Sequence, residues 1–367
     1  MVGHLKPFGI YLLYRQESQH YSEWQHVDLP LWNHVMDKQS YTLKDVVGIG
    51  NAMVDVLAQT DETFLLTHNL VKGSMILVDA EHAASIYESM GTSLEISGGS
   101  VGNTMAGIAS LGGTGSYIGK VRNDQLGRVF HDEMESIGIT FSTNLALDGS
   151  PTARCMVIVT PDGQRSMATY LGACVELNAD DINADIIRSH RITYLEGYLW
   201  DSPHAKEAMM KAARLANDNG RQVALSLSDS FCVDRHRESF RDLIMNQVDI
   251  LFANEEEIIS LYQTENVYGA IDICRKDCRL LIVTRGSYGS LISVEDVVYQ
   301  VDPVPIERIV DTTGAGDMYA AGFLFGMTHG YDIMSSGRIG AIAAGEIISH
   351  MGARPEADLQ ELMRLTI

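Results

Sequence analysis

The sequence predicts an α/β fold with a doubly wound, mainly parallel β-sheet flanked by helices, and a small additional β-sheet. Short apolar runs recur along the chain, for example at 46–50 and 223–227, and each has the length of a buried strand. Helical patterns lie between these runs, which is the alternation expected of parallel strands joined by helices. Residues 152–171 differ, because two strand-like runs there are joined by a short turn sequence.

The composition is typical of a folded globular protein and narrows the classes of partner. The chain has 367 residues, of which 46% are hydrophobic and 20% charged, so it can bury a large core. A net charge of -21 disfavours nucleic-acid polymers and anionic membrane surfaces as partners, and no uninterrupted run of about eighteen apolar residues occurs. ATP remains compatible, because backbone N–H groups can bind phosphate inside an acidic protein. Five cysteines without paired spacing predict reduced thiols and a cytoplasmic protein.

Residues 1–40 differ from the rest of the chain. They contain Trp24, Trp32 and four histidines, with no sustained helical or strand period and no evident blocks of a secretory signal. Two interpretations stay open: a poorly ordered extension, or sequence upstream of the true start, with Met36 as the initiator. The globular domain is therefore expected to span 41–367.

From Val46 onward the predicted elements follow one another in a regular order. Val46–Gly50 is an apolar run that ends in glycine, as a buried strand does at its carboxyl end. Apolar residues on one face predict a helix over 126–137, and Pro203 opens an alanine-rich helix that Asn219–Gly220 ends. Further strands are predicted at 223–227, 248–252 and 280–284, and a further helix at 318–327.

The small sheet is predicted from three regions of the chain. Ala153–Thr160 and Ser166–Leu171 are strand-like and flank Pro161–Asp162–Gly163–Gln164, whose residue types favour a turn. Gly73–Asp79 is another candidate strand, and a further one is drawn from about 52–60. Such a sheet would serve as the lid of a monomer or as the interlocking edge of a homodimer, and both stay open.

The segment with the clearest chemistry is Asp311–Thr312–Thr313–Gly314–Ala315–Gly316–Asp317, which precedes the helix at 318–327. Gly314 and Gly316 remove side chains where the backbone must approach a ligand, and the helix begins with unpaired N–H groups and a positive dipole end. These features predict an anion pocket suited to a transferring phosphoryl group. Asp317 would lie at its edge and accept a proton from an attacking hydroxyl. The alternative is a plain glycine turn into a helix.

A second glycine-rich pattern, taken together with the 311–317 segment, resembles a known family. Residues 97–104 read Ser-Gly-Gly-Ser-Val-Gly-Asn-Thr and lead on to 106–113 and 119–127. This pattern and the 311–317 segment are similar to the N-terminal and C-terminal signatures of the ribokinase-like (PfkB) carbohydrate and nucleoside kinases. The resemblance covers 46 to about 355. It implies a ribokinase-like fold with a small β-sheet lid, a kinase activity, ATP as phosphate donor, and Mg²⁺.

On the phosphate side, the resemblance implies a base and an anion hole. Asp317 resembles the base that activates the acceptor hydroxyl, and Gly314, Ala315 and Gly316 resemble the anion hole. The same resemblance implies that Asn254, a cofactor-binding residue, and Glu257 organise Mg²⁺ through water, although such an Asn-x-x-Glu run can also simply begin a helix.

Two weaker matches complete the phosphate side. The end of the family's nucleotide-binding strand is matched by Thr284, Gly286 and Gly289, for which a plain glycine turn is the alternative. Asp311 and Thr313 match positions that help to bind a monovalent cation such as K⁺ in many members.

On the acceptor side, the resemblance assigns Asp55 to the substrate's hydroxyl groups. A carboxylate can accept hydrogen bonds from two neighbouring hydroxyls, which suits a ribose or hexose. The alternative is a surface aspartate that caps a turn. The residues alongside it would be Asn51, Gly98, Gly99 and Asn103. Arg165 resembles a lid arginine that approaches the transferred phosphate, although a solvent-facing arginine beside a turn fits the same sequence.

The adenosine kinase subgroup is the leading assignment within the family. Residues 226–231 and 248–255 are similar to that subgroup, in which the aromatic residue at the place of Phe231 stacks on the purine base. Core packing is the alternative role for Phe231. A ribose or fructose kinase is the second choice, and a non-catalytic nucleoside-binding protein the third. A dinucleotide-binding oxidoreductase is disfavoured, because Met53 stands where the third glycine of its fingerprint belongs.

Overall fold

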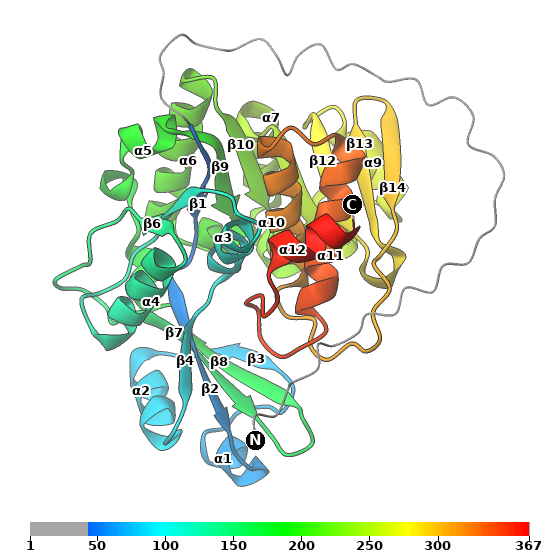
Figure 1. The fold of residues 1–367 in the computed structure, drawn as a ribbon. Coiled ribbons are helices and arrows are strands. Elements are labelled where there is room, and N and C mark those ends of the chain that lie inside the picture. Colours follow the sequence, from blue (N-terminus) through cyan, green and yellow to red (C-terminus); the bar gives the residue numbers. More distant parts are fainter. Residues whose placement is uncertain (1–42, 367) are drawn as a thin grey trace, which may run out of the picture. The chain divides into compact units, whose positions relative to one another are not determined.

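The structure is a computed structural model that describes residues 43–366 (Figure 1). The extension predicted at 1–40 lies outside these residues, so its nature stays a prediction. The described residues contain a central sheet with the strands β1 (Lys44–Ile49), β5 (Gly115–Ile118), β6 (Ile139–Phe141), β9 (His190–Glu196), β10 (Gln222–Ser226), β11 (Ile250–Asn254), β12 (Leu280–Thr284), β13 (Ser290–Val294) and β14 (Val297–Val301). Their spatial order is β14-β13-β12-β11-β10-β9-β1-β5-β6, with β13 and β14 as an antiparallel edge on an otherwise parallel sheet.

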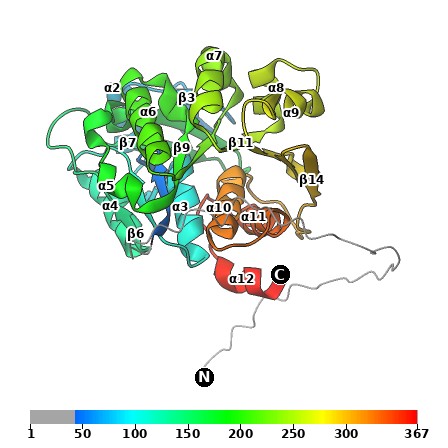
Figure 2. The same cartoon turned by 90° about the horizontal axis from the view of Figure 1, so that it is seen from above.

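Helices cover both faces of the central sheet (Figures 1 and 2). Strand residues alternate between two cores, so that Val46 and Ile250 face one side while Val47 and Leu251 face the other. Burial on both faces explains why these strands read as nearly continuous apolar runs. The first side is covered by α3 (Ser100–Ser110), α10 (Ala315–Thr328) and α11 (Ile333–Ile347), and α12 (Leu359–Thr366) packs on the outside of α3 and α11. The second side is covered by α5 (Ala184–Arg188), α6 (Pro203–Asp218), α7 (Ser230–Gln247), α8 (Glu255–Tyr262) and α9 (Val267–Cys274).

A second sheet has five strands in the order β3-β8-β7-β2-β4. Its strands are β2 (Met53–Gln59), β3 (Met75–Leu77), β4 (Leu94–Ser97), β7 (Ala153–Val159) and β8 (Arg165–Tyr170). One face packs Val54, Val56 and Met156 into a core shared with α1 (Glu62–Thr67), α2 (Ala80–Ser89) and α4 (Gln125–Ser136). Because side chains alternate along a strand, the other face presents Asp55 and Leu57 away from this core.

The fold class predicted from the sequence is confirmed. The predicted turn at 161–164 joins β7 to β8, and the Thr160 N–H donates to the Gln164 carbonyl across it. β11 begins two residues later than predicted, because Asp249 lies just before the strand and exchanges hydrogen bonds with Val223. β4, β5, β6, β9 and the β13–β14 hairpin were not predicted. β9 reads His-Arg-Ile-Thr-Tyr-Leu-Glu, which mixes polar and apolar residues.

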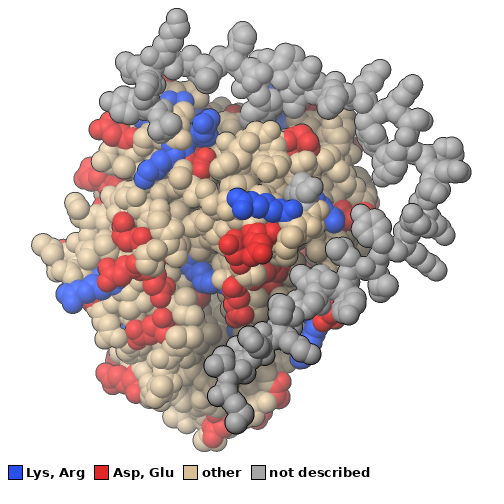
Figure 3. Space-filling view, in the orientation of Figure 1, with Lys and Arg blue, Asp and Glu red and all other residues tan. Residues whose placement is uncertain are grey.

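The surface and the cysteines add little specific chemistry. On the face shown in Figure 3, acidic and basic side chains are interspersed among uncharged ones. Across residues 43–366, every helix is too short or too polar to cross a bilayer. All five cysteines are buried and unpaired.

Candidate active site

A cleft of about 870 Å³ lies between the inner face of the small sheet and the carboxyl ends of the central strands. Ser226, Asn254 and Thr284, the last residues of β10, β11 and β12, line one side of it, and Asp55 lines the other. Ligands of doubly wound α/β proteins bind at this end of the sheet. The predicted site residues that line the cleft are Asp55, Gly99, Asn103, Arg165, Asn254, Glu257, Thr284, Thr313, Gly314, Ala315, Gly316 and Asp317, whereas Asn51, Gly98, Phe231, Gly286, Gly289 and Asp311 do not line it.

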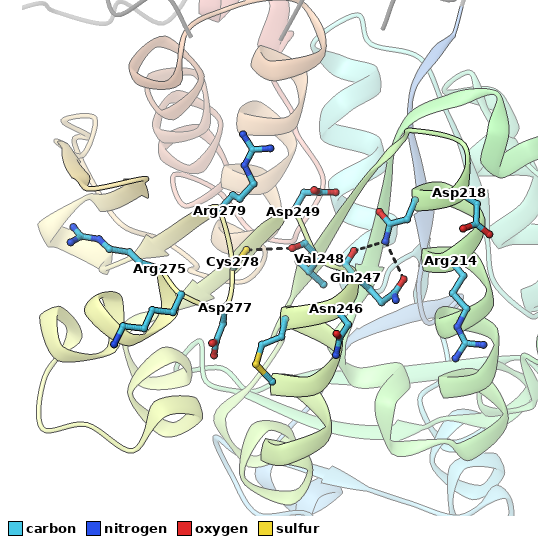
Figure 4. Close-up of a pocket in the computed structure, with 13 residues that line it drawn as sticks. Arg214, Asp218, Asn246, Gln247, Val248, Asp249, Arg275, Asp277, Cys278 and Arg279 are labelled. Carbon is cyan, nitrogen blue, oxygen red and sulfur yellow. Dashed lines mark hydrogen bonds between the residues drawn. The ribbon is translucent and has the colours of Figure 1, made fainter. Parts of the chain in front are cut away.

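A second hollow of about 430 Å³ lies at the opposite ends of β11 and β12 (Figure 4). The guanidinium groups of Arg214, Arg275 and Arg279 point in different directions around it instead of converging. Neighbouring polar groups are engaged locally, since Asn217 donates to Gln247 and Cys278 contacts the Val248 carbonyl. The chemistry predicted from the sequence therefore gathers in the first cleft.

Asp317 lies in the first turn of α10 and is held by two side chains of α3. Ser100 Oγ donates to Asp317 Oδ1 over 2.6 Å, and Asn103 Nδ2 donates to Asp317 Oδ2 over 2.9 Å. Burial raises the pKa of Asp317, and these two hydrogen bonds act in the opposite direction. The two glycine-rich patterns, more than 200 positions apart in the sequence, thus meet at one carboxylate.

Gly314 and Gly316 lack side chains for different reasons. Gly314 precedes α10 with a φ of 79°, a left-handed conformation, and a Cβ there would come within 2.8 Å of the Ala353 Cβ. A Cβ on Gly316 would meet no atom within 4 Å and would enter the cleft. Glycine at 314 is therefore required by the fold, whereas glycine at 316 leaves room for a ligand.

Asp55 faces this centre from β2. Its carboxylate lies against Gly98, where a Cβ would approach Oδ2 within 2.5 Å. Burial raises the pKa of Asp55 to about 6, and the charges of Arg354 and Arg165 partly counter that shift. Gly99 has a φ of 80° and its backbone approaches the Asn51 carbonyl, so both glycines have packing reasons as well.

Asn51 lies behind the cleft, only 4% exposed, and is held by a residue that the sequence analysis missed. Its amide Nδ2 donates to Glu196 Oε1 over 2.6 Å, and the Val101 N–H donates to Glu196 Oε2 over 3.0 Å. Glu196 is 1% exposed, and burial raises its pKa to about 7. It ends β9, whose mixed sequence concealed both the strand and this carboxylate.

Asn254 and Glu257 form a reciprocal cap at the start of α8. The Glu257 N–H donates to Asn254 Oδ1, while the Asn254 N–H and amide donate to the two oxygens of Glu257. Burial raises the pKa of Glu257 to about 7. A buried carboxylate that borders the cleft suits a hydrated Mg²⁺, whose charge would favour its ionised form. No cluster of three or more acidic, histidine or cysteine side chains able to hold a metal occurs within residues 43–366.

The turn after β12 holds the two glycines predicted for the nucleotide. Both have positive φ values, 55° at Gly286 and 73° at Gly289. A Cβ on Gly289 would come within 2.1 Å of the Val301 carbonyl oxygen, so packing alone requires glycine there. Only Thr284 of this group lines the cleft.

Asp311 and Arg165, predicted for different ligands, are paired with each other. Arg165 Nη1 lies 2.6 Å from Asp311 Oδ2, which also accepts the Gly352 N–H over 2.9 Å. Asp311 Oδ1 accepts both the N–H and the hydroxyl of Thr313. The role of Asp311 and Thr313 in binding a monovalent cation stays a prediction.

The aromatic residues that line the cleft differ from the one that the sequence indicated. Phe231 lies in the first turn of α7, is 73% exposed and does not line the cleft, so it is not a core residue either. Its stacking role stays a prediction. Tyr194 and Tyr198 do line the cleft, and Arg354 joins them from the segment after α11. Single-sequence patterns gave no signal for these three residues.

Comparison with known proteins decides the family. The sequence pattern of the pfkB family carbohydrate kinases matches residues 67–359. The chain belongs to this family. The solved adenosine kinase of Sinorhizobium meliloti is 47% identical with a TM-score of 0.81, covering 88% of this chain and 99% of that chain.

Two further relatives of this pfkB kinase are a probable sugar kinase and a second adenosine kinase. A probable sugar kinase from Rhizobium etli CFN 42 is 46% identical with a TM-score of 0.81, covering 88% of this chain and 98% of its own. The adenosine kinase of Saccharomyces cerevisiae is 26% identical over 330 residues, 84% of this chain and 95% of its own length. The pfkB resemblance predicted from the two glycine-rich patterns is confirmed, and the chain is a phosphotransferase whose family implies the use of ATP.

Proposed function

We propose that this pfkB kinase transfers the γ-phosphoryl group of ATP to the primary (5′) hydroxyl of a nucleoside, with adenosine as the leading acceptor. The observation that carries the proposal is the half-buried Asp317 carboxylate beside the open first turn of α10, across the cleft from Asp55. The similarity to adenosine kinases along most of the chain supports the choice of acceptor.

Asp317 would act as the general base. As the acceptor oxygen bonds to the γ-phosphorus, its proton passes to the carboxylate, and the bond from the γ-phosphorus to the bridging oxygen breaks to release ADP. Ser100 and Asn103 hold this carboxylate with one donor on each oxygen, which fixes the direction of the remaining lone pairs. Their hydrogen bonds also favour its ionised form, the form that accepts a proton.

The backbone of 314–316 would stabilise the charge on the transferring group. The N-terminus of α10 carries a positive dipole end, and unpaired N–H groups there can donate to phosphoryl oxygens. Glu257 and Asn254 would hold Mg²⁺ through its water shell, and the bound ion would offset charge on the ATP phosphates. The small sheet, tied to the 311–317 segment by the Arg165–Asp311 pair, would exclude water from the reaction.

Asp55 would orient the acceptor by receiving hydrogen bonds from its ring hydroxyls. Its carboxylate lines the cleft beside Gly99, and apolar Leu57, Ile96 and Val157 of the same sheet surround it. An apolar surface suits a flat base better than a free sugar. The aromatic stacking partner stays a prediction for Phe231, and Tyr198 is the cleft-lining alternative.

The test is ADP release from ATP and Mg²⁺ with adenosine, other nucleosides, ribose and fructose. We expect the fastest turnover with adenosine. A free-sugar kinase is the second candidate, supported by the 46% identical probable sugar kinase from Rhizobium etli. Turnover with ribose or fructose alone would establish that alternative, and saturable adenosine binding without ADP release would indicate a non-catalytic binding protein.

The stacking assignment has its own test. Phe231→Ala and Tyr198→Ala are compared for the Michaelis constant of adenosine, because loss of a stacked base should weaken binding by about 1–3 kcal/mol. If only Tyr198→Ala raises it, Phe231 is not the stacking residue. A Michaelis constant unchanged in both variants would remove aromatic stacking from the proposal.

A further inference from the structure

Arg354 enters the cleft from the segment that follows α11 and makes three directed hydrogen bonds. Its Nε donates to the Ser97 carbonyl over 2.8 Å and its Nη2 to the Ser97 hydroxyl over 2.8 Å. Its Nη1 donates to the Gly102 carbonyl over 2.7 Å. Within residues 43–366 no carboxylate lies within 4 Å of its guanidinium nitrogens, so its charge is not consumed by a local ion pair.

The two ends of one functional segment are joined by these hydrogen bonds. Ser97 ends β4 and Gly102 lies in the first turn of α3, so the planar guanidinium spans the segment between them. That segment contains Gly98, which packs against the Asp55 carboxylate, and Ser100, which donates to Asp317. A shift of either end would therefore move the partners of both carboxylates.

The charge of Arg354 acts on the same two carboxylates. It opposes the effect of burial on the pKa values of Asp55 and Asp317, and it is the largest charge effect on each. The other titratable groups that face this trio come from β8, β7, β9, the turn after β9, α4 and β5, and they are Arg165, Cys155, Tyr194, Glu196, Tyr198, Glu133 and Tyr117. Arg165 is already paired with Asp311, whereas Arg354 has no carboxylate within 4 Å among residues 43–366.

We infer that Arg354 is a positioning residue for phosphoryl transfer, which clamps the Ser97–Gly102 segment and places a positive charge beside Asp55 and Asp317. The inference rests on the roles proposed above for these two aspartates. It separates into a geometric part, which needs the planar fork, and an electrostatic part, which needs only the charge.

Two variants separate these parts in pH profiles of kcat/KM. Arg354→Gln removes both the fork and the charge, so the acidic limb should move up by about one pH unit and turnover at neutral pH should fall about tenfold or more. Arg354→Lys keeps the charge but not the fork, so the limb should stay near the wild-type pH while KM for the acceptor rises. Arg275→Gln, whose partner Asp272 lies outside the cleft, is the matched control and should behave as wild type.

An acidic limb unchanged in Arg354→Gln would overturn the electrostatic part, and a wild-type KM in Arg354→Lys would overturn the geometric part. If the Gln variant does not fold, as judged by circular dichroism, the Lys variant still decides the geometric part through KM, because it loses the planar fork while it keeps the charge. Asp317→Asn is measured alongside. Retained turnover in that variant would refute the proposed base, whereas its loss together with a wild-type limb in Arg354→Gln would refute only the inference about Arg354.

Discussion

Two helices begin at the cleft after a glycine with a positive φ, but the N–H groups of their first turns differ in their hydrogen-bond partners. Gly99 precedes α3 with a φ of 80°, Gly314 precedes α10 with a φ of 79°, and neither supplies a side-chain cap. At α3, the Val101 N–H donates to the buried carboxylate of Glu196. At α10, the N–H groups of Gly316 and Asp317 have no hydrogen-bond partner among the described residues.

The difference indicates where an external anion belongs. A helix N-terminus favours negative charge, and the chain's own carboxylate already satisfies that preference at α3. α3 is thereby a fixed support whose side chains Ser100 and Asn103 hold Asp317. At α10 no carboxylate of the described residues accepts from the N–H groups of Gly316 and Asp317, so a bound anion can do so. The phosphoryl group is therefore expected at α10 and not at α3.

The largest expected effect comes from Asp317→Asn, which tests the chemistry assigned to α10. The amide cannot accept the hydroxyl proton, so we expect turnover to fall by about two to four orders of magnitude. Fold and ligand affinity should be retained, as measured by thermal unfolding and by calorimetric binding of adenosine. Near-normal turnover would remove the base assignment.

Gly316→Ala tests whether the open turn of α10 is ligand space. The new methyl group meets no protein atom within 4 Å, and alanine favours a helix by about 1 kcal/mol, so thermal stability should be kept or raised. Turnover should nevertheless fall about tenfold or more, because the methyl group enters the anion pocket. Gly314→Ala should instead lose stability, through its positive φ and the contact with Ala353.

The control for these glycine variants is Gly269→Ala in α9, where a Cβ would make only ordinary contacts of 3.5 Å or more. Both activity and fold should survive that change. Wild-type turnover in Gly316→Ala would show that the space beside Gly316 is not used.

The pH dependence tests the acceptor side of the cleft. Burial raises the pKa of Asp55 to about 6, and only the ionised carboxylate can accept a hydrogen bond from a hydroxyl on each of its two oxygens without donating one itself. As pH falls through 6, kcat/KM should therefore drop about tenfold per unit. The fold should not weaken through this group, because a raised carboxyl pKa costs stability at higher pH and that cost is recovered as the group takes up its proton. A flat profile between pH 5 and 7 would contradict the role of Asp55.

The smallest effect on chemistry is expected at the support helix. Glu196→Ala leaves the Val101 N–H and the Asn51 amide without their acceptor, so the free energy of unfolding should fall by about 1–3 kcal/mol. Because Glu196 does not line the cleft, turnover of the folded fraction should change less than in Asp317→Asn. Urea unfolding and an active-site titration measure the two quantities. A loss of turnover as large as that of Asp317→Asn would place α3 in the chemistry itself.

The sequence predicted the elements whose residues are locally unambiguous. β12 and the start of α6 match the expected residues, because an apolar run and a proline at the first helical position need no tertiary information. β9 was missed because it contains polar residues that are nevertheless buried in the centre of the sheet, and a single sequence does not reveal this burial. Glu196, at the end of β9, was missed with it.

The same reasoning separates the predicted from the unpredicted parts of the site. Residues 311–317 carry their chemistry within seven consecutive positions, so the pocket at α10 could be inferred from the sequence. Arg354 donates hydrogen bonds to Ser97 and Gly102, about 250 positions away in the sequence, and Arg165 forms an ion pair with Asp311. Such long-range pairs leave no local pattern. Phe231 shows the converse, since a matching residue type did not bring the side chain into the cleft.

The most direct test of the account is the position of phosphate in a crystal structure with adenosine, Mg²⁺ and a non-hydrolysable ATP analogue. The account predicts γ-phosphate oxygens within about 3 Å of the Gly316 and Asp317 N–H groups, and an acceptor hydroxyl within about 3 Å of the Asp317 carboxylate. Terminal phosphate bound at the start of α3, or away from both helices, would contradict it.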